Sequence, residues 1–217
     1  MARVPFESLS LHYSMHRTLS FGPDDLLSKI VKGSGGYCME LNTFFVSVLR
    51  SLNYPLFSVG GRVGMGGAYG GWNHQLNIVT IDCRRYVVDV RFCSNGPLQP
   101  NPPEDGREFP QIAPARGKLE CKALPIHTDA SQLLPCRFRS DEPHHHEMNL
   151  TSMTSPRNFF VYAVMYIRTI LDDRTGKLIG LLILLRDYVK RQLGGHAEII
   201  ENLETKAWRV AALRKWF

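Results

Sequence analysis

Three residues of this 217-residue sequence, Cys38, His74 and Asp89, have types and surroundings that suit nucleophilic catalysis. Cys38 lies in "GSGGYCMELN" (33–42), after two glycines and at the point where a helical pattern begins. Glycines allow a sharp turn and close backbone approach. The amino end of a helix favours the thiolate over the thiol, and its N–H groups can hold an oxyanion. Cys38 is therefore a candidate nucleophile, with a buried structural cysteine as the alternative.

The residues that could act as base and orienting carboxylate are His74 and Asp89. They lie in two β-rich runs around a polar turn at 82–85, which predicts a hairpin. The pairing of the two strands decides whether they can meet. If the numbers of two directly paired residues add to an odd number, the side chains of His74 and Asp89 lie on the same face of the hairpin and can hydrogen-bond. If the numbers add to an even number, the two side chains lie on opposite faces. Because an aspartate among valines is costly to bury unpaired, His74 is its expected partner. The carboxylate would orient the imidazole as a Cys-His-Asp triad requires.

Helices are expected to position the thiol. The segment from Pro23 to Gly33 has start and stop signals and one apolar face. After Cys38, apolar residues recur at spacings of three and four, which predicts a helix with one buried face. These residues are Leu41, Phe44, Phe45, Val48, Leu49 and Leu52. The first 55 residues are therefore predicted to be mainly helical.

The rest of the chain is predicted to be mainly strands. The seven glycines of 59–73 indicate a mobile loop, and 96–156, with ten of the thirteen prolines, indicates irregular or short-stranded structure. A second hairpin is expected over 157–187, with "DDRTGK" as its turn. An amphipathic helix is expected over 197–217. This order of helices, strands and a closing helix favours the α+β class.

Composition narrows the function classes. The sequence is 44% hydrophobic and 21% charged, as in ordinary globular proteins. Its net charge of +6 comes from scattered Lys and Arg without a basic tract, so no nucleic-acid partner is expected. The longest apolar run (178–185) is too short to span a bilayer and no signal-peptide core is present. Five cysteines without a C-x-x-C pair are interpreted as free thiols, which favours a cytoplasmic location.

Four segments, in this order, carry a specific resemblance. They are "VPFESLSLHY" (4–13), "KIVKGSGGYCMELNTFF" (29–45), "WNHQLNIVTIDCRRYVVDVRF" (72–92) and "TSMTSPRNFF" (151–160). Together they resemble the arylamine N-acetyltransferases over almost the whole length of the chain. A chance Cys-His-Asp set would not bring these flanking residues with it.

The resemblance implies a cysteine-protease-like core in three domains. These are a helical domain (1–57) with the nucleophile, a β-barrel domain (58–150) with His74 and Asp89, and an α/β lid (151–217) ending in an amphipathic helix. Relative to the family pattern, the first helix and an early Tyr and Arg motif are missing.

The implied activity is ping-pong acetyl transfer of the kind used in xenobiotic metabolism. Cys38 would take an acetyl group from acetyl-coenzyme A, a co-substrate rather than a bound cofactor, and pass it to an arylamine, arylhydrazine or N-hydroxyarylamine. His74 would be its ion-pair partner and Asp89 the orienting carboxylate. The implied contacts with the acyl group, coenzyme A or the amine are Tyr69, Gly70, Gly71, Tyr37 and Phe92.

Several departures from the family pattern keep alternatives open. Ser34 replaces an arginine before Gly-Gly, and Arg91 and Cys93 replace glycines after Asp89. Arg91 would suit an anionic acyl group, and the same departures would fit a degenerate homologue that binds coenzyme A but acylates poorly. A papain-like or transglutaminase-like thiol hydrolase would share the triad but not "PFESLS" or "TSPRNFF". The histidines at 144–146 are expected to be surface residues, without a metal.

Overall fold

The computed structural model describes residues 2–65, 68–90, 92, 96–121, 136–140, 146–147 and 159–217, the side chains of 62–65, 68–72, 120–121, 136–140 and 146–147 excepted. The helices are α1 (Leu9–Tyr13), α2 (Pro23–Val31), α3 (Cys38–Ser51), α4 (Phe159–Tyr162) and α5 (Lys206–Trp216). The strands up to residue 121 are β1 (Phe6–Glu7), β2 (Leu56–Met65), β3 (Ala68–Ile81), β4 (Arg84–Val88), β5 (Glu108–Pro110) and β6 (Arg116–Cys121). The later strands are β7 (Cys136–Ser140), β8 (His146–Glu147), β9 (Met165–Leu171), β10 (Leu178–Leu185), β11 (Tyr188–Leu193) and β12 (His196–Asn202).

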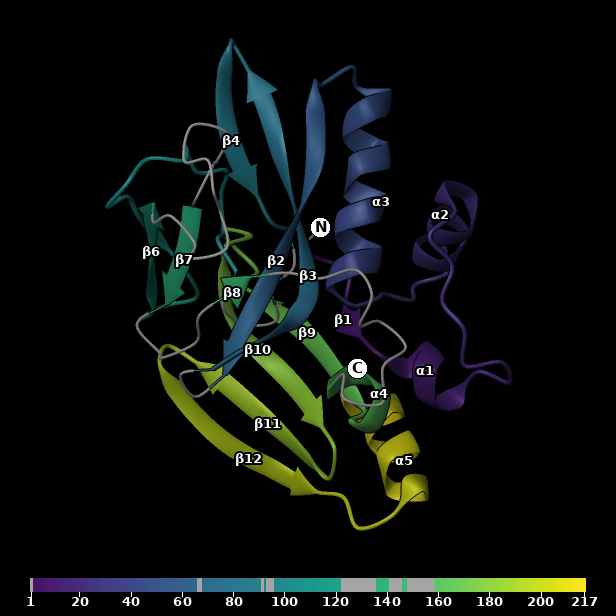
Figure 1. The fold of residues 1–217 in the computed structure, drawn as a ribbon. Coiled ribbons are helices and arrows are strands. Elements are labelled where there is room, and N and C mark those ends of the chain that lie inside the picture. Colours follow the sequence, from purple (N-terminus) through teal and green to yellow (C-terminus); the bar gives the residue numbers. More distant parts are fainter. Residues whose placement is uncertain are drawn as a thin grey trace.

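One sheet joins the two ends of the chain. Its strand order is β1-β9-β10-β11-β12, with all neighbours antiparallel. The predicted hairpin is confirmed as β9 and β10. Strand β10 is apolar without alternation because both of its faces are buried. Leu181 and Ile183 pack in the core that holds Cys38, whereas Leu182 and Leu184 pack in the core that α5 covers. Figure 1 shows α5 against this sheet and α3 beside β2 and β3.

The boundary of the last helix was predicted wrongly. Residues 196–202 form strand β12, and helix α5 begins only at Lys206. Gly194 and Gly195, both with positive φ, turn the chain so that β12 pairs with β11. Thr205 then caps α5 by accepting a hydrogen bond from the backbone N–H of Trp208 (3.2 Å). The apolar spacing of residues 196–202 also fits a helix, but this segment is a strand because it pairs with β11 at the edge of the sheet.

The glycine-rich segment is not the loop that we predicted. Most of it lies in strands β2 and β3, which pair from Leu56 with Val79 to Met65 with Ala68, with two register shifts near Arg62. Hydrogen bonds between strands use only backbone N–H and C=O groups. The pairing of the apolar ends of β2 and β3 can therefore extend through the glycines.

The central strands do not close into a barrel within the described part of the chain. They form one sheet of order β4-β3-β2-β8 and another of order β5-β6-β7. The α+β class is confirmed, but the expected barrel is not seen. The short strands β5, β6, β7 and β8 agree with the prediction for the proline-rich segment. No helix in the described residues is long and apolar enough to cross a membrane.

Candidate active site

Helix α3 begins at Cys38, as its sequence predicts. Two close backbone approaches set the path into the helix: a Cβ on Gly35 would lie 1.9 Å from the carbonyl oxygen of Pro5, and one on Gly36 would lie 2.8 Å from Cβ of Glu40. Only glycine fits both positions. The Cys38 side chain is buried, and its sulfur lies 3.9 Å from the carbonyl oxygen of Asn73, the residue before His74. The thiol thus lies at a helix amino end, beside the strand that carries the histidine.

The β3–β4 hairpin brings His74 and Asp89 together. Asn77 pairs with Val88 and Ile81 with Arg84, so paired positions add to 165, an odd number. The His74 and Asp89 side chains therefore lie on one face, and Nε2 of His74 is 2.5 Å from Oδ2 of Asp89. Because a carboxylate only accepts, Nε2 carries the shared proton. The other ring nitrogen, Nδ1, is buried without a hydrogen-bond partner among the described residues. It is the atom available to take a proton.

Asn42 is a site residue that the sequence analysis missed. Its Nδ2 donates to Oδ1 of Asp89 (2.9 Å), and its Oδ1 accepts from the backbone N–H of Val90 (3.1 Å). Its backbone oxygen accepts from Nδ2 of Asn77 (3.3 Å). Asn42 follows Cys38 by four residues and therefore shares its face of α3. That spacing was the available signal: a polar side chain one turn beyond a candidate nucleophile, on the same helix face.

The aromatic residues proposed to contact substrate differ in position. The half-buried ring of Phe92 packs edge-on against His74, with centroids 4.9 Å apart, and so borders the site. Tyr37 instead lies in the core: its side chain is fully buried and packs on Phe160, with centroids 5.2 Å apart. Burial, first of all, raises the pKa of the Tyr37 phenol far above its ordinary value. The prediction that Tyr37 forms a wall of the amine site stays a prediction, and in this structure its ring packs in the core.

Other predicted residues can be placed only in part. Tyr69 pairs through its backbone with Gly64, and Gly70 and Gly71 continue β3; the side chain of Tyr69 lies outside the described residues, as do Arg91 and Cys93. Of the three histidines, His146 is in β8, opposite Val63. No group of three metal-ligating side chains occurs in the part of the chain that the structure describes.

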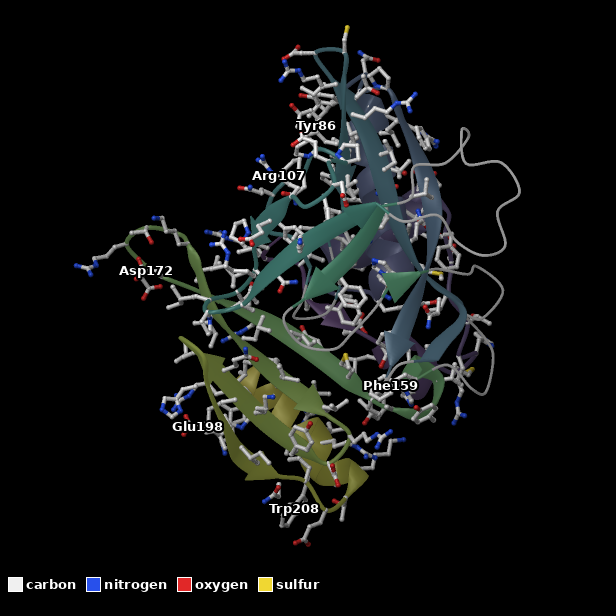
Figure 2. The ribbon with its side chains drawn as sticks, turned by 60° about the vertical axis from the view of Figure 1, so that its left-hand side comes forward. Tyr86, Arg107, Phe159, Asp172, Glu198 and Trp208 are labelled. Atoms are coloured by element: carbon white, nitrogen blue, oxygen red, sulfur yellow. The ribbon has the colours of Figure 1, made fainter. Side chains whose placement is uncertain are left out.

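Figure 2 shows Phe159 where the sheet β1-β9-β10-β11-β12 meets the lower ends of strands β2 and β3, with Asp172 and Glu198 at the periphery.

The arrangement can carry out thiol chemistry. The sulfur of a cysteine at a helix amino end lies near the backbone of Asn73, the residue before His74. Nε2 of His74 is held by the buried carboxylate of Asp89, and that carboxylate is itself held by the amide of Asn42. Such an imidazole can accept a thiol proton at Nδ1, and the first N–H groups of α3 can receive developing negative charge.

Comparison with known proteins decides the family. A family model described as N-acetyltransferase matches residues 1–115. The chain belongs to the arylamine N-acetyltransferase family. Over 99% of its length it is 32% identical to "N-malonyltransferase FDB2" of Fusarium pseudograminearum, of which it covers 74%. It is 32% identical to "Arylamine N-acetyltransferase 2" of Macaca mulatta over 50% of its own length and 39% of that protein.

The fold also matches solved arylamine N-acetyltransferases. The Mycobacterium marinum enzyme, solved in complex with CoA, superimposes with a TM-score of 0.73 at 21% identity, covering 97% of this chain and 79% of that one. This match establishes the arylamine N-acetyltransferase fold, which is cysteine-protease-like, and the chain is an acyltransferase of this family.

Proposed function

We propose that the chain is an N-acyltransferase that carries an acyl group on Cys38, taking it from an acyl-coenzyme A and passing it to an aromatic amine, arylhydrazine or N-hydroxyarylamine. The observation that carries this proposal is the 2.5 Å contact between His74 and Asp89, in a chain of this family whose Cys38 begins α3 with its sulfur 3.9 Å from the carbonyl oxygen of Asn73. The Mycobacterium marinum relative solved with CoA supports an acyl-CoA as co-substrate.

In the first half-reaction, Nδ1 of His74 takes the thiol proton and the sulfur of Cys38 attacks the thioester carbonyl. The carbon–sulfur bond to coenzyme A breaks, and coenzyme A leaves with the proton that His74 returns. In the second, the amine attacks the acyl-Cys38 thioester, His74 takes a proton from the amine nitrogen, and the Cys38 sulfur leaves. Asp89 keeps the imidazole oriented throughout and stabilises the imidazolium.

Two acyl donors are candidates. Acetyl-coenzyme A follows from the family resemblance. Malonyl-coenzyme A is favoured by the similarity to an N-malonyltransferase, because that similarity covers 99% of the chain, whereas the similarity to the macaque acetyltransferase covers 50%. The sequence also carries Arg91 just after Asp89, where a cation would suit a free carboxylate on the acyl group. We therefore place malonyl-coenzyme A first.

The test is intact mass spectrometry after brief exposure to malonyl- or acetyl-coenzyme A without amine. We expect one adduct of the acyl mass, more of it from the malonyl donor, none in Cys38→Ala, and its loss when an arylamine is added. An adduct only from acetyl-coenzyme A would reverse the choice of donor. No adduct from folded protein with either donor would favour the degenerate homologue, and release of coenzyme A at full rate without amine would favour a thiol hydrolase.

We also propose a cytoplasmic location. A cysteine nucleophile must stay reduced, and neither Cys38 nor Cys83 is in a disulfide bond. Fractionation of cells that express the tagged protein tests this proposal: we expect the tag in the cytoplasmic fraction, and its recovery from an oxidising compartment would contradict the proposal.

A further inference from the structure

Three charged side chains from separate elements meet beside residues 33–37, the segment that leads into Cys38 and that we call the Cys38 loop. The Nζ atom of Lys29, on α2, lies 2.7 Å from Oε1 of Glu40, on α3, and 3.5 Å from Oε1 of Glu7, on β1. Both glutamate side chains are 3% exposed, and that of Lys29 is 21% exposed. One ammonium group thus bridges two buried carboxylates.

Each carboxylate uses its second oxygen to hold the start of a helix. Oε2 of Glu40 accepts from the backbone N–H of Tyr37 (3.2 Å), immediately before Cys38. Oε2 of Glu7 accepts from the backbone N–H of Leu9 (2.5 Å), the first residue of α1. Glu7 also donates its backbone N–H to the carbonyl of Gly36 (3.0 Å). The cluster therefore fixes the path of the chain through Gly36 and Tyr37 into Cys38.

Position 34 is the neighbour of this cluster in the sequence and in space. It holds serine where the family motif has arginine before Gly-Gly. Ser34 is exposed, and its backbone N–H donates to the carbonyl oxygen of Lys29 (3.2 Å). The ammonium group of Lys29 reaches the same loop from the last turns of α2, through its contact with Glu40.

We propose that Lys29 is the positioning residue for the Cys38 loop and takes the place of the arginine that is absent at position 34. The role of Lys29 in catalysis rests on the proposed function. Lys29 acts through Glu40 and Glu7 and does not contact the substrate.

The physical need for a cation is clear. Burial raises the pKa of Glu40, and Lys29 opposes that rise while Glu7 adds to it. Without the ammonium, two buried carboxylates would face each other, so one would take up a proton or move towards water. Either change would loosen the hydrogen bond from Glu40 to Tyr37 and so the first turn of α3.

The experiment follows the reactivity of Cys38 directly. Lys29→Met, Lys29→Arg and the double variant Lys29→Met/Ser34→Arg are treated with iodoacetamide near neutral pH, well below their Tm, and alkylation of each cysteine is followed by peptide mass spectrometry. Cys83, exposed in the β3–β4 turn, is the internal control in the same sample. Alkylation needs no acyl donor, so it tests Lys29 even if the proposed function fails. An absent acyl adduct with normal alkylation would count against the proposed function alone.

We expect Lys29→Met to slow alkylation of Cys38 by about tenfold or more, because small displacements at a site have large effects on rate, with Cys83 unchanged. Lys29→Arg should keep most of the reactivity, and Ser34→Arg should restore it in the double variant. Unchanged Cys38 reactivity in Lys29→Met would overturn the proposal, as would rescue by Lys29→Arg but not by Ser34→Arg. If Lys29→Met does not fold, the double variant decides: a folded protein with reactive Cys38 supports the proposal, and an unfolded one overturns it.

Discussion

Nε2 of His74 and Oδ2 of Asp89 lie 2.5 Å apart, although fifteen residues separate them in the sequence. His74 is within β3, and Asp89 follows the last residue of β4. Both side chains are almost completely buried, and Asn42 donates to the second oxygen of the aspartate. A buried carboxylate is stable only when its oxygens are satisfied, so the imidazole and the amide together hold Asp89 in place.

Asp89→Asn tests this relationship. An amide at this position can present its NH₂ group to Nε2, which would favour the wrong tautomer of His74 and leave Nδ1 protonated. We expect acyl transfer to fall by about 10³- to 10⁴-fold, as in other triads, with the fold unchanged. The rate of acyl-Cys38 formation by mass spectrometry and the circular dichroism spectrum measure the two effects. Asp24→Asn, at an exposed position on α2, is the matched control; equal rates in both variants would contradict the role of Asp89.

Asn42→Ala tests the support of the aspartate. It removes the donor to Asp89 and the acceptor for the N–H of Val90, leaving two groups at the site without these bonds. We expect the free energy of unfolding to fall by about 2–4 kcal/mol, measured by urea titration, and acyl transfer to fall with it. Thr43→Val is the control, because Thr43 bonds Gln75 (3.1 Å) rather than Asp89. If Asn42→Ala transfers acyl groups as fast as Thr43→Val, Asn42 has no part in the site.

The sequence was most informative where one local rule decided the outcome. The pairing of His74 and Asp89 depends only on whether paired positions add to an odd number. We expected a four-residue turn at 82–85, and the structure has a two-residue turn at Asp82 and Cys83. Both turns give an odd sum, so the prediction held although the turn length was wrong. The helix after Cys38 was equally accessible, because a turn signal preceded a clear helical period.

Features that depend on distant partners could not be predicted. Strand β12 has apolar residues at spacings that suit a helix, and its pairing with β11 decided its structure. The buried position of Tyr37 depends on Phe160, which is far away in sequence. The bridge from Lys29 to Glu7 and Glu40 joins three separate elements. Periodicity and motifs describe neighbours along the chain, whereas these contacts arise only when the elements pack.

The raised pKa of Glu40 predicts a pH-dependent stability. Burial is its main cause, and Lys29 only partly offsets it. A carboxyl whose pKa is higher in the folded than in the unfolded protein stabilises the fold below its unfolded pKa, and this contribution is lost as pH rises through the folded pKa. Glu40→Gln cannot ionise, so we expect its Tm to rise relative to that of the unmodified chain between about pH 4 and pH 7.

Thermal melts across that pH range, followed by circular dichroism, measure the difference for Glu40→Gln. The matched control is Glu204→Gln, at an exposed position before α5. Its Tm difference from the unmodified chain should stay constant over the range. A constant difference for Glu40→Gln as well would show that ionisation of the buried Glu40 carboxyl does not destabilise the fold.

Gly35→Ala tests whether the close approach of Pro5, the residue before β1, to the Cys38 loop matters for the thiol. The new Cβ would lie 1.9 Å from the carbonyl oxygen of Pro5, a backbone atom, so the loop or β1 must move. We expect the free energy of unfolding to fall by about 2–3 kcal/mol. Gly22→Ala is the control, because its Cβ would meet only side-chain atoms, the carboxylate of Asp25 at 3.2 Å and the hydroxyl of Ser20 at 3.5 Å, which can rotate away. Because the moved loop leads directly into Cys38, alkylation of Cys38 should slow in Gly35→Ala and stay normal in Gly22→Ala. A Gly35→Ala variant that loses stability but keeps full Cys38 reactivity would show that the loop path supports the fold without positioning the nucleophile.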